Sequence, residues 1–384
     1  MVTKPALTPG PFEFATAGRI VFGAGTFSQL SGIAAGMGAK PLLVTGRRMV
    51  GAPGLEGPRF IVAGEPTLDT VREGVIAFRE GACDSVIAIG GGSAIDAGKA
   101  IAAAAANPGN LLDYVEVVGK GQPLVCAPYP FIAVPTTAGT GSEVTRNAVL
   151  GSPEHGVKVS LRSPRMLPRA AIIDPRLMLG LPPAITAATG LDALTQLIEP
   201  YVSSRANPLI DALCVDGIRQ VAASLPRVLS DGSDEEARTG MAYASLLGGL
   251  ALANAGLGAV HGFAAPIGGM FHAPHGAVCA VLLSVVMRAN ITALREREPR
   301  HPSLDRYRDI ARLLTAEPEA SAEDGVEWVR LLVAKLAIPS LFAYGIADAD
   351  IPGLVEKAAR ASSMKANPVV LTPAELTEVL ANSL

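Results

Sequence analysis

A glycine triplet at residues 90–92 constrains the fold of this chain more than any other feature. It follows an apolar run at 85–89 that is typical of a buried strand, and it precedes an alanine-rich segment at 94–106 with strong helix propensity. A strand that turns through glycines into a helix presents unpaired backbone amides and the positive end of the helix dipole to an anion. The sequence therefore predicts a phosphate-binding turn at Gly91 and Gly92.

Polar side chains follow the triplet at the expected start of the helix. Ser93 is expected to be the N-cap, because a serine hydroxyl accepts hydrogen bonds from the free amides of the first turn. Asp96 comes three residues later, where a carboxylate can reach back to the cap amide. Ordinary strand-to-helix turns have similar sequences, so the glycine motif alone leaves both interpretations open.

Short strands alternate with helices in the first part of the chain, whereas only helices follow residue 182. Such alternation is typical of a parallel sheet with helices on its faces. The expected strands and helices of the first part are strands 20–22, 41–45, 59–62, 85–89, 131–134 and 170–174 and helices 67–80 and 94–106. Helical periodicity then covers 186–201, 210–229, 235–253, 278–294, 307–314, 325–336 and 373–384. The chain of 384 residues is long enough for two domains, which we predict to be an α/β domain at 1–182 and an all-helical domain at 183–384.

A second loop, residues 135–143, follows the expected strand at 131–134. Small hydroxyl groups on a flexible loop suit contacts with a ribose or a nicotinamide, and a structural turn rarely needs so many of them. The hydroxyl side chains of this loop are Thr136, Thr137, Thr140 and Ser142.

Together, the two segments resemble those of the iron-containing, or group III, alcohol dehydrogenases. The resemblance extends from 19–25 to Asn367 and Pro368, so it spans nearly the whole chain. It implies an NAD(P)-binding α/β domain followed by an all-helical metal and substrate domain, an architecture shared with dehydroquinate synthase. It also implies hydride transfer between a nicotinamide cofactor and a small alcohol, aldehyde or ketone.

The resemblance also assigns roles to the two loops. In the family, the glycine loop holds the cofactor pyrophosphate and the threonine-rich loop lines the nicotinamide side. The cofactor contacts that it implies here are Gly91, Gly92, Ser93, Asp96, Thr136, Thr137, Thr140 and Ser142. Lys158 lies where family members commonly have a lysine that faces the cofactor, although a surface lysine is an equal alternative.

The end of the strand at 41–45 bears on the choice of cofactor. NAD-preferring relatives have an aspartate directly after the Val-Thr pair, whereas this chain has Gly46. The missing carboxylate removes repulsion against a 2′-phosphate, and Arg47 or Arg48 could bind one. We therefore expect NADP(H) to be preferred over NAD(H). The alternative is that both arginines are solvated loop charges.

A metal site follows from the resemblance. In the family, an aspartate, a histidine four residues later and two further histidines hold Fe(II) or Zn(II). Asp192, His261 and His275 match this pattern, whereas the fourth position is Gln196, which shares a helix face with Asp192. Because an amide oxygen is a weaker, neutral ligand, we expect a divalent metal that is bound more loosely. Hydrogen-bonded core histidines and a formed but empty site are the alternatives.

A second departure from the family is Ala265, where many relatives have a histidine near the nicotinamide. His272 is a spare imidazole that could replace that proton relay or contact substrate, and it is the candidate catalytic residue. The departures at Gln196 and Ala265 keep two further functions open: a metal-independent enzyme similar to maleylacetate reductase, and a nucleotide-binding homologue with weakened catalysis. A lyase related to dehydroquinate synthase fits the threonine-rich loop less well.

Composition limits the partners. The net charge of -3 and the absence of basic clusters give no sign of a nucleic-acid partner. Hydrophobic residues make up 49% of the chain, which favours a large core and a homodimer. The first residues lack the apolar stretch of a signal peptide, so we expect a cytoplasmic protein. The run 239–287 has no charged Asp, Glu, Lys or Arg, and we interpret it as a buried helical layer rather than as membrane spans.

The cysteines complete the expectations. They form no CxxC pair, so they are expected to be reduced thiols, mostly buried, and a cysteine zinc site is disfavoured. The four cysteines are Cys83, Cys126, Cys214 and Cys279.

Overall fold

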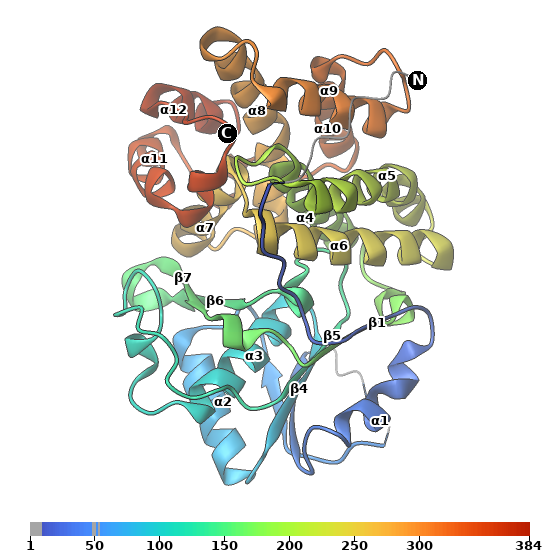
Figure 1. The fold of residues 1–384 in the computed structure, drawn as a ribbon. Coiled ribbons are helices and arrows are strands. Elements are labelled where there is room, and N and C mark those ends of the chain that lie inside the picture. Colours follow the sequence, from blue (N-terminus) through green and yellow to red (C-terminus); the bar gives the residue numbers. More distant parts are fainter. Residues whose placement is uncertain (1–9, 48–50, 53) are drawn as a thin grey trace.

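A six-stranded parallel sheet forms the N-terminal region of the protein (Figure 1). The structure is a computed structural model and describes residues 10–47, 51–52 and 54–384. The strand order is β1-β8-β5-β4-β2-β3. The strands are β1 (Ile20–Phe22), β2 (Pro41–Gly46), β3 (Arg59–Val62), β4 (Ser85–Gly90), β5 (Phe131–Pro135) and β8 (Ala170–Ile173). Because all of them are parallel, the ends of β2, β4 and β5 meet at one edge, where Gly90 pairs with Pro135.

Apolar side chains of the strands point alternately to the two faces of the sheet, as strand geometry requires. Leu42 and Val86 join the buried cluster of α2 (Leu68–Glu80) and α3 (Gly92–Ala106). Leu43 and Ile87 point to the opposite face, where they pack with α1 (Leu30–Ala34). Both faces are covered, which explains the continuous apolar runs in the sequence.

A separate antiparallel hairpin, which the sequence analysis did not anticipate, follows the threonine-rich loop. It consists of β6 (Asn147–Ser152) and β7 (Val157–Arg162). The hairpin packs against α3 on one side and against a helix of the C-terminal region, α7 (Ala259–Phe271), on the other. The hairpin therefore connects the helix that follows the glycine turn to the helical region.

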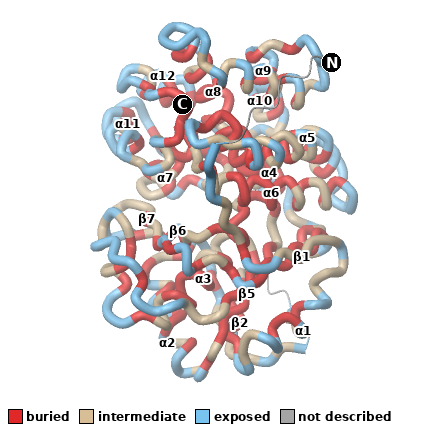
Figure 2. Tube along the Cα trace, viewed as in Figure 1, coloured by how far each residue is buried: buried red, intermediate tan, exposed pale blue. Residues whose placement is uncertain are grey.

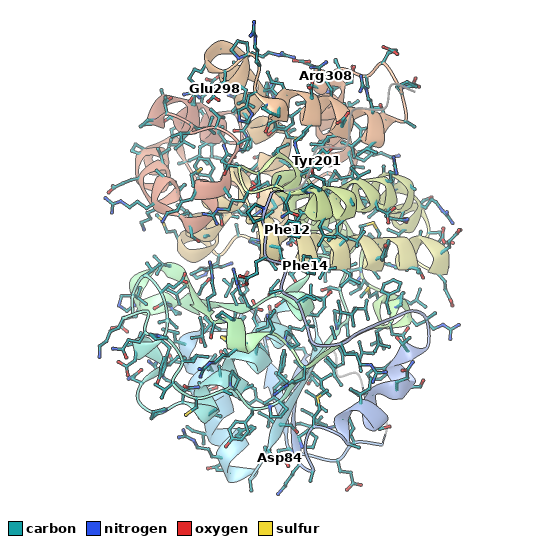
Figure 3. All side chains as sticks on the ribbon, in the orientation of Figure 1. Phe12, Phe14, Asp84, Tyr201, Glu298 and Arg308 are labelled. Carbon is teal, nitrogen blue, oxygen red and sulfur yellow. The ribbon has the colours of Figure 1, made fainter. Side chains whose placement is uncertain are left out.

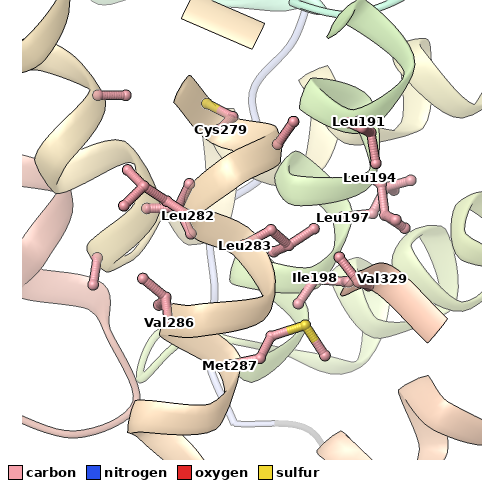
Figure 4. Close-up of a cluster of buried hydrophobic side chains, with 14 of the residues drawn as sticks. Leu191, Leu194, Leu197, Ile198, Cys279, Leu282, Leu283, Val286, Met287 and Val329 are labelled. Atoms are coloured by element: carbon pink, nitrogen blue, oxygen red, sulfur yellow. The ribbon is translucent and has the colours of Figure 1, made fainter. Parts of the chain in front are cut away.

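Helices form the rest of the protein. They are α4 (Pro183–Val202), α5 (Pro208–Ser230), α6 (Glu235–Ala255), α7 (Ala259–Phe271), α8 (His275–Arg297), α9 (Pro302–Thr315), α10 (Ala322–Lys335), α11 (Ile351–Arg360) and α12 (Pro373–Ala381). Figure 2 shows that α4, α6 and α8 are largely buried at the centre. Figure 4 shows part of this core, with Leu194 and Leu197 of α4 near Leu283 and Met287 of α8.

The predicted fold class, a parallel α/β region followed by an all-helical region, is confirmed. The last strand of the sheet ends at Ile173 and α4 begins at Pro183. The division into separate domains at residue 182 stays a prediction.

Helix α8 is long and apolar enough to cross a membrane, yet 72% of its most apolar stretch is buried inside the protein. Helices α6 and α7 pass the same criterion only as a pair that is bent by 99°. The run at 239–287 thus forms α6, α7 and the first half of α8, and it supplies much of the helical core.

The segment before β1 links the two regions. The Ala15 amide donates to Oδ1 of Asn254 on α6 at 2.7 Å, and Nδ2 of Asn254 donates to the Ala15 carbonyl at 3.1 Å. Figure 3 shows Phe12 and Phe14 on this segment beside the helical region. Phe14 is half-buried against the helical core, so the segment that precedes β1 is held against the helical region.

Candidate functional site

The glycine turn lies at the edge of the sheet where β4 ends. Helix α3 begins at Gly92 and its N-cap is Gly91, without a capping side chain. The predicted N-cap at Ser93 is therefore wrong, because the helix starts two residues earlier than that cap requires. A helix start without a side-chain cap leaves its first amides available to an anion.

The threonine-rich loop lies directly against this turn. The Thr136 amide donates to the Gly90 carbonyl at 2.9 Å. A Cβ added at Gly92 would lie 2.7 Å from Cγ2 of Thr140, and one added at Gly91 would lie 3.3 Å from Oγ1 of Thr137. Glycine is thus required at residue 92 for close approach, and the two predicted cofactor loops are in contact.

Asp96 faces the threonine-rich loop rather than the start of its own helix. Its Oδ1 accepts a hydrogen bond from the Ser142 hydroxyl, and its Oδ2 accepts one from the Val149 amide at 3.0 Å. The prediction that Asp96 reaches back to the cap amide is therefore wrong, since the loop and β6 use both oxygens. Burial raises the pKa of Asp96, although the charge of Lys99 opposes the shift.

Lys99 fastens α3 to the loop that follows β5. Its buried Nζ donates to the carbonyls of Ser142 and Asn147, both at 2.7 Å, and to Oγ1 of Thr145 at 3.0 Å. Burial lowers the pKa of Lys99 to about 8, against the charges of Asp96 and Glu143. These bonds fix the position of the threonine-rich loop.

A second group of polar side chains gathers in the helical region. Asp192 comes from α4, His261 from α7, and His275 and Cys279 from the first turns of α8. One ligand-type atom from each residue lies within 4.8 Å of the others. Nε2 of His261 is 3.5 Å and Nε2 of His275 is 3.6 Å from Oδ1 of Asp192. The structure therefore brings together three of the four predicted metal ligands, with a cysteine beside them.

Glu199 orients the buried His261 ring. Its Oε2 lies 2.7 Å from Nδ1 of His261, and its Oε1 accepts from the Val260 amide at 2.7 Å. A carboxylate on one ring nitrogen directs the other toward a metal ion, and this arrangement is common around metal-bound histidines. The sequence analysis did not identify Glu199 as a site residue.

Two oxygens beside this cluster have no hydrogen-bond partner in the described part of the chain. They are Oδ1 of Asp192 and Oε1 of Gln196, and both side chains are buried. Burying an unpaired carboxylate oxygen is costly unless a cation accompanies it. The donor set and the unpaired oxygens together fit a divalent metal ion.

The four clustered side chains influence one another strongly. Burial lowers the pKa of His261, but the charges of Cys279 and Glu199 more than compensate, so the pKa lies well above its usual value. Burial likewise lowers the pKa of His275, but the charges of Cys279 and Asp192 outweigh burial and raise the pKa above its usual value. Burial raises the pKa of the Cys279 thiol, while the two histidines lower it to a greater extent. The cluster thus holds protons that a cation could replace.

Contacts between the two regions bring the two groups close to each other. A Cβ added at Gly139 would lie 2.7 Å from Cβ of Thr189, one turn before Asp192 on α4. The charge of His275 also lowers the pKa of Asp96 in opposition to burial. The threonine-rich loop therefore lies between the glycine turn and the helix that carries Asp192.

Gly46, Arg47 and Lys158 lie outside the cluster. Gly46 ends β2, and a Cβ added there would meet no atom of the described residues within 4 Å. Arg47 is exposed, and Arg48 lies outside the described residues. Nζ of Lys158, on β7, forms an ion pair with Glu65 at 2.8 Å, and its side chain is only 9% exposed.

His272 caps the C-terminal end of α7 in the left-handed conformation, with φ of 53°, and is exposed. It is not among the clustered ligands. Ala265, earlier on the same helix, is half-buried. The geometry leaves the catalytic role of His272 as a prediction.

Two family models match the chain. The "Iron-containing alcohol dehydrogenase" model matches residues 17–175, and the "Fe-containing alcohol dehydrogenase family, C-terminal" model matches residues 186–384. The chain belongs to the iron-containing alcohol dehydrogenase family. The predicted family, and with it an oxidoreductase of the alcohol dehydrogenase type, is confirmed.

Relatives of this alcohol dehydrogenase agree over most of its length. A 1,3-propanediol dehydrogenase of Klebsiella pneumoniae is 41% identical over 309 residues, which cover 79% of this chain and 76% of the relative. Alcohol dehydrogenase 4 of Schizosaccharomyces pombe is 40% identical and is matched over 83% of this chain and 73% of its own. A crystal structure of 1,3-propanediol oxidoreductase superposes with a TM-score of 0.88 at 35% identity, covering 98% of this chain and 100% of the other.

Family membership establishes the coarse chemistry of the enzyme. It is a metal-assisted oxidoreductase that transfers hydride between a nicotinamide cofactor and an alcohol or carbonyl compound. Among the relatives, the methanol dehydrogenase of Bacillus methanolicus is named NAD-dependent and is 36% identical over 83% of this chain. That name does not support the predicted preference for NADP(H).

Cys279 is the clustered residue that the sequence analysis missed. The prediction of mostly buried, free thiols is confirmed for Cys83, Cys214 and Cys279, while Cys126 is exposed. The available signal was the spacing of four residues between His275 and Cys279, which places both on one face of a helix.

Proposed function

We propose that this alcohol dehydrogenase exchanges hydride between NADP(H) and a small, uncharged alcohol or carbonyl compound, with Fe(II) or Zn(II) held by Asp192, His261 and His275. The proposal rests chiefly on one observation: these three side chains converge from three helices beside buried oxygens that lack hydrogen-bond partners. Oε1 of Gln196 is the fourth ligand expected from the sequence, and as a neutral donor it would bind the ion weakly.

Several relatives are named for alcohols in general or for small alcohols, while one is named a long-chain-alcohol dehydrogenase and one a 4-hydroxybutyrate dehydrogenase. The surroundings of the donors carry few charges, because α6 and α7 contain none between 239 and 271. A short, uncharged alcohol or aldehyde therefore fits this site better than an acid does.

The residues of the two loops would bind and orient the cofactor. The free amides at the start of α3 would receive the pyrophosphate at Gly91, Gly92 and Ser93. Thr136, Thr137 and Thr140 would line the nicotinamide side of the same turn. When bound, the metal ion would polarise the substrate carbonyl oxygen as a Lewis acid.

Asp96 and Ser142 would act by holding the threonine-rich loop. The Ser142 hydroxyl donates a hydrogen bond to Asp96, and Nζ of Lys99 donates one to the Ser142 carbonyl. We expect Asp96 and Ser142 to act on the cofactor mainly indirectly, by holding the loop that contacts it. A loop held in this way would orient the nicotinamide without rearrangement at each turnover.

Lys158 and His272 would complete the cofactor and substrate sides. Lys158 is largely buried beside Gly268 of α7, so its charge is available to a cofactor phosphate only if the ion pair with Glu65 opens. His272, exposed three residues before His275, would relay a proton to solvent or contact substrate in place of the histidine that Ala265 replaces.

Gly46 is the basis for the NADP(H) preference. β2 ends in Gly46, and among the described residues beyond its chain neighbours no atom lies within 4 Å of a Cβ placed there, which leaves space for a 2′-phosphate. Arg47, which is exposed, would provide the positive charge.

We further propose that the enzyme is a cytoplasmic homodimer that binds neither nucleic acid nor a membrane. The small net charge of -3 and the apolar composition of 49% support this part of the proposal.

Steady-state kinetics test the proposed function. NADPH and NADH are compared on a panel of small aldehydes, ketones and alcohols, using the wild type, Gly46→Asp and the neutral control Gly46→Asn. We expect the wild type to prefer NADPH. Gly46→Asp should lower kcat/KM for NADPH by about tenfold or more through repulsion of the 2′-phosphate, while Gly46→Asn changes it much less.

Two outcomes would contradict parts of the proposal. A clear preference of the wild type for NADH would refute the cofactor choice. Binding of NADPH without turnover across the whole panel would favour the nucleotide-binding homologue with weakened catalysis.

A further inference from the structure

Cys279 lies at the centre of the donor cluster. Its Sγ is 3.7 Å from Nε2 of His275 and 3.9 Å from Nε2 of His261. The side chain is fully buried, and Figure 4 shows it on α8 at the end of the apolar core. A thiol is therefore aimed at the same nitrogen atoms that face Asp192.

The distances match the edges of one coordination sphere. Ligand bonds of roughly 2.0–2.3 Å at tetrahedral angles place ligand atoms about 3.3–3.8 Å apart. The separations of Oδ1 of Asp192 from the two histidine nitrogens are 3.5 and 3.6 Å. The sulfur lies slightly farther from the same nitrogens, at 3.7 and 3.9 Å, close to the upper end of this range.

Independent observations indicate that a cation belongs here. Within residues 10–47, 51–52 and 54–384, Oδ1 of Asp192 is buried without a hydrogen-bond partner, and so is Oε1 of the neighbouring Gln196. Asp192 is 1% exposed and Gln196 is 3% exposed, so water does not reach these side chains freely. The cysteine is thus accompanied by unpaired buried oxygens, not by a complete hydrogen-bond network.

Gln196 has a different role beside the donor cluster, which is to position Asp192. Burial raises the pKa of Asp192, but the charge of His275, the neighbouring His261 and, to a smaller extent, Gln196 lower it below its usual value. An amide that donates to a ligand carboxylate positions that ligand, in the way that outer carboxylates position histidines. The thiol, in contrast, contacts the two histidine nitrogens, with a carboxylate oxygen of Asp192 within 4.8 Å.

We propose that Cys279 is the fourth protein ligand of the metal ion, in place of Gln196, so that the donor set is one carboxylate, two imidazoles and one thiolate. On metal binding the thiol releases its proton to solvent, a metal–sulfur bond forms, and no electron is transferred. A thiolate is a softer donor than an amide oxygen, so the site selects Zn(II) over Fe(II). The inference rests on the metal site of the proposed function.

Cobalt substitution tests the inference. The metal-free full-length protein is titrated with Co(II), and the near-ultraviolet thiolate-to-cobalt charge-transfer band is recorded for the wild type, Cys279→Ser and Gln196→Ala. Cys214→Ser, which alters another fully buried thiol, is the matched control. We expect one equivalent of Co(II) to produce the band in the wild type, Gln196→Ala and Cys214→Ser, and Cys279→Ser to lack it.

Metal affinity, measured by competition with a chromophoric chelator, gives a second readout. Cys279→Ser should bind Zn(II) roughly tenfold or more weakly, and Gln196→Ala should lose less. If Cys279→Ser fails to fold, metal-dependent protection of Cys279 from alkylation in the wild type takes its place. A band that persists in Cys279→Ser, or Co(II) bound without any thiolate band, would overturn the inference.

The same samples separate this inference from the proposed function. Turnover with NADPH and no thiolate band would sink the ligand assignment while leaving the hydride-transfer proposal intact. A thiolate band without turnover on any substrate would support the ligand assignment and contradict the hydride-transfer proposal.

Discussion

Glu143 is a buried carboxyl in the threonine-rich loop, next to the ammonium of Lys99. It is 2% exposed, and burial raises its pKa to about 7 from an ordinary 4.5, even though Lys99 opposes the shift. In the unfolded chain this group loses its proton near pH 4.5. Between those two values the folded protein therefore keeps a proton that the unfolded chain has released.

The sign of the resulting pH dependence follows from this difference. A raised carboxyl pKa gives stability that is fully present below pH 4.5 and is lost as the pH rises through about 7. Glu143→Gln removes this titration. We expect the wild type to lose stability relative to Glu143→Gln by about 1–3 kcal/mol over that range. Melting temperatures of both proteins at pH 5, 6, 7 and 8 measure the difference, and parallel curves would contradict the shift.

The threonine-rich loop and α6 meet without side chains between them. A Cβ added at Gly249 of α6 would lie 2.5 Å from the Gly141 carbonyl oxygen and 2.7 Å from its Cα. Gly141 itself has φ of 58°, a conformation that favours glycine. The backbone of the loop is thus seated on the helix, and this contact sets the distance between the sheet region and the helical region.

Gly249→Ala should separate these two elements. Alanine improves helix propensity by up to about 1 kcal/mol, but the clash with the Gly141 backbone should cost about 1–3 kcal/mol and displace the loop. We expect a lower melting temperature and a higher KM for the cofactor. Gly353→Ala on α11 is the control, because a Cβ there meets no atom within 4 Å. It should leave KM unchanged and not lower the melting temperature. A Gly249→Ala variant that behaves like this control would contradict the proposed contact.

At the scale of the whole molecule, local patterns predicted the elements well and long-range pairing poorly. The strand at 85–89 and the helix at 94–106 are found at Ser85–Gly90 and Gly92–Ala106. The helix starts earlier because glycines fit a helix start as readily as a turn, which residue type alone does not reveal. The β6–β7 hairpin was missed, although Val157–Arg162 alternates apolar and polar residues.

The candidate site shows the same division. Asp192, His261 and His275 were found through a family resemblance, because spacing along the chain does not say which helices meet. Cys279 was missed, since its partners lie on three helices and a cysteine without a CxxC pair was taken as core. Only the packing of α4, α7 and α8 brings its sulfur to the histidines.

The central claim is that hydride transfer in this enzyme depends on a metal ion held opposite the glycine turn. Its most direct test is the rate of NADPH-dependent aldehyde reduction by protein freed of metal with a chelator, before and after one equivalent of Zn(II) or Fe(II) is restored. The account predicts a loss of about 100-fold or more and recovery at one metal ion per chain. An unchanged rate in the metal-free protein would contradict it and would favour a metal-independent reductase similar to maleylacetate reductase.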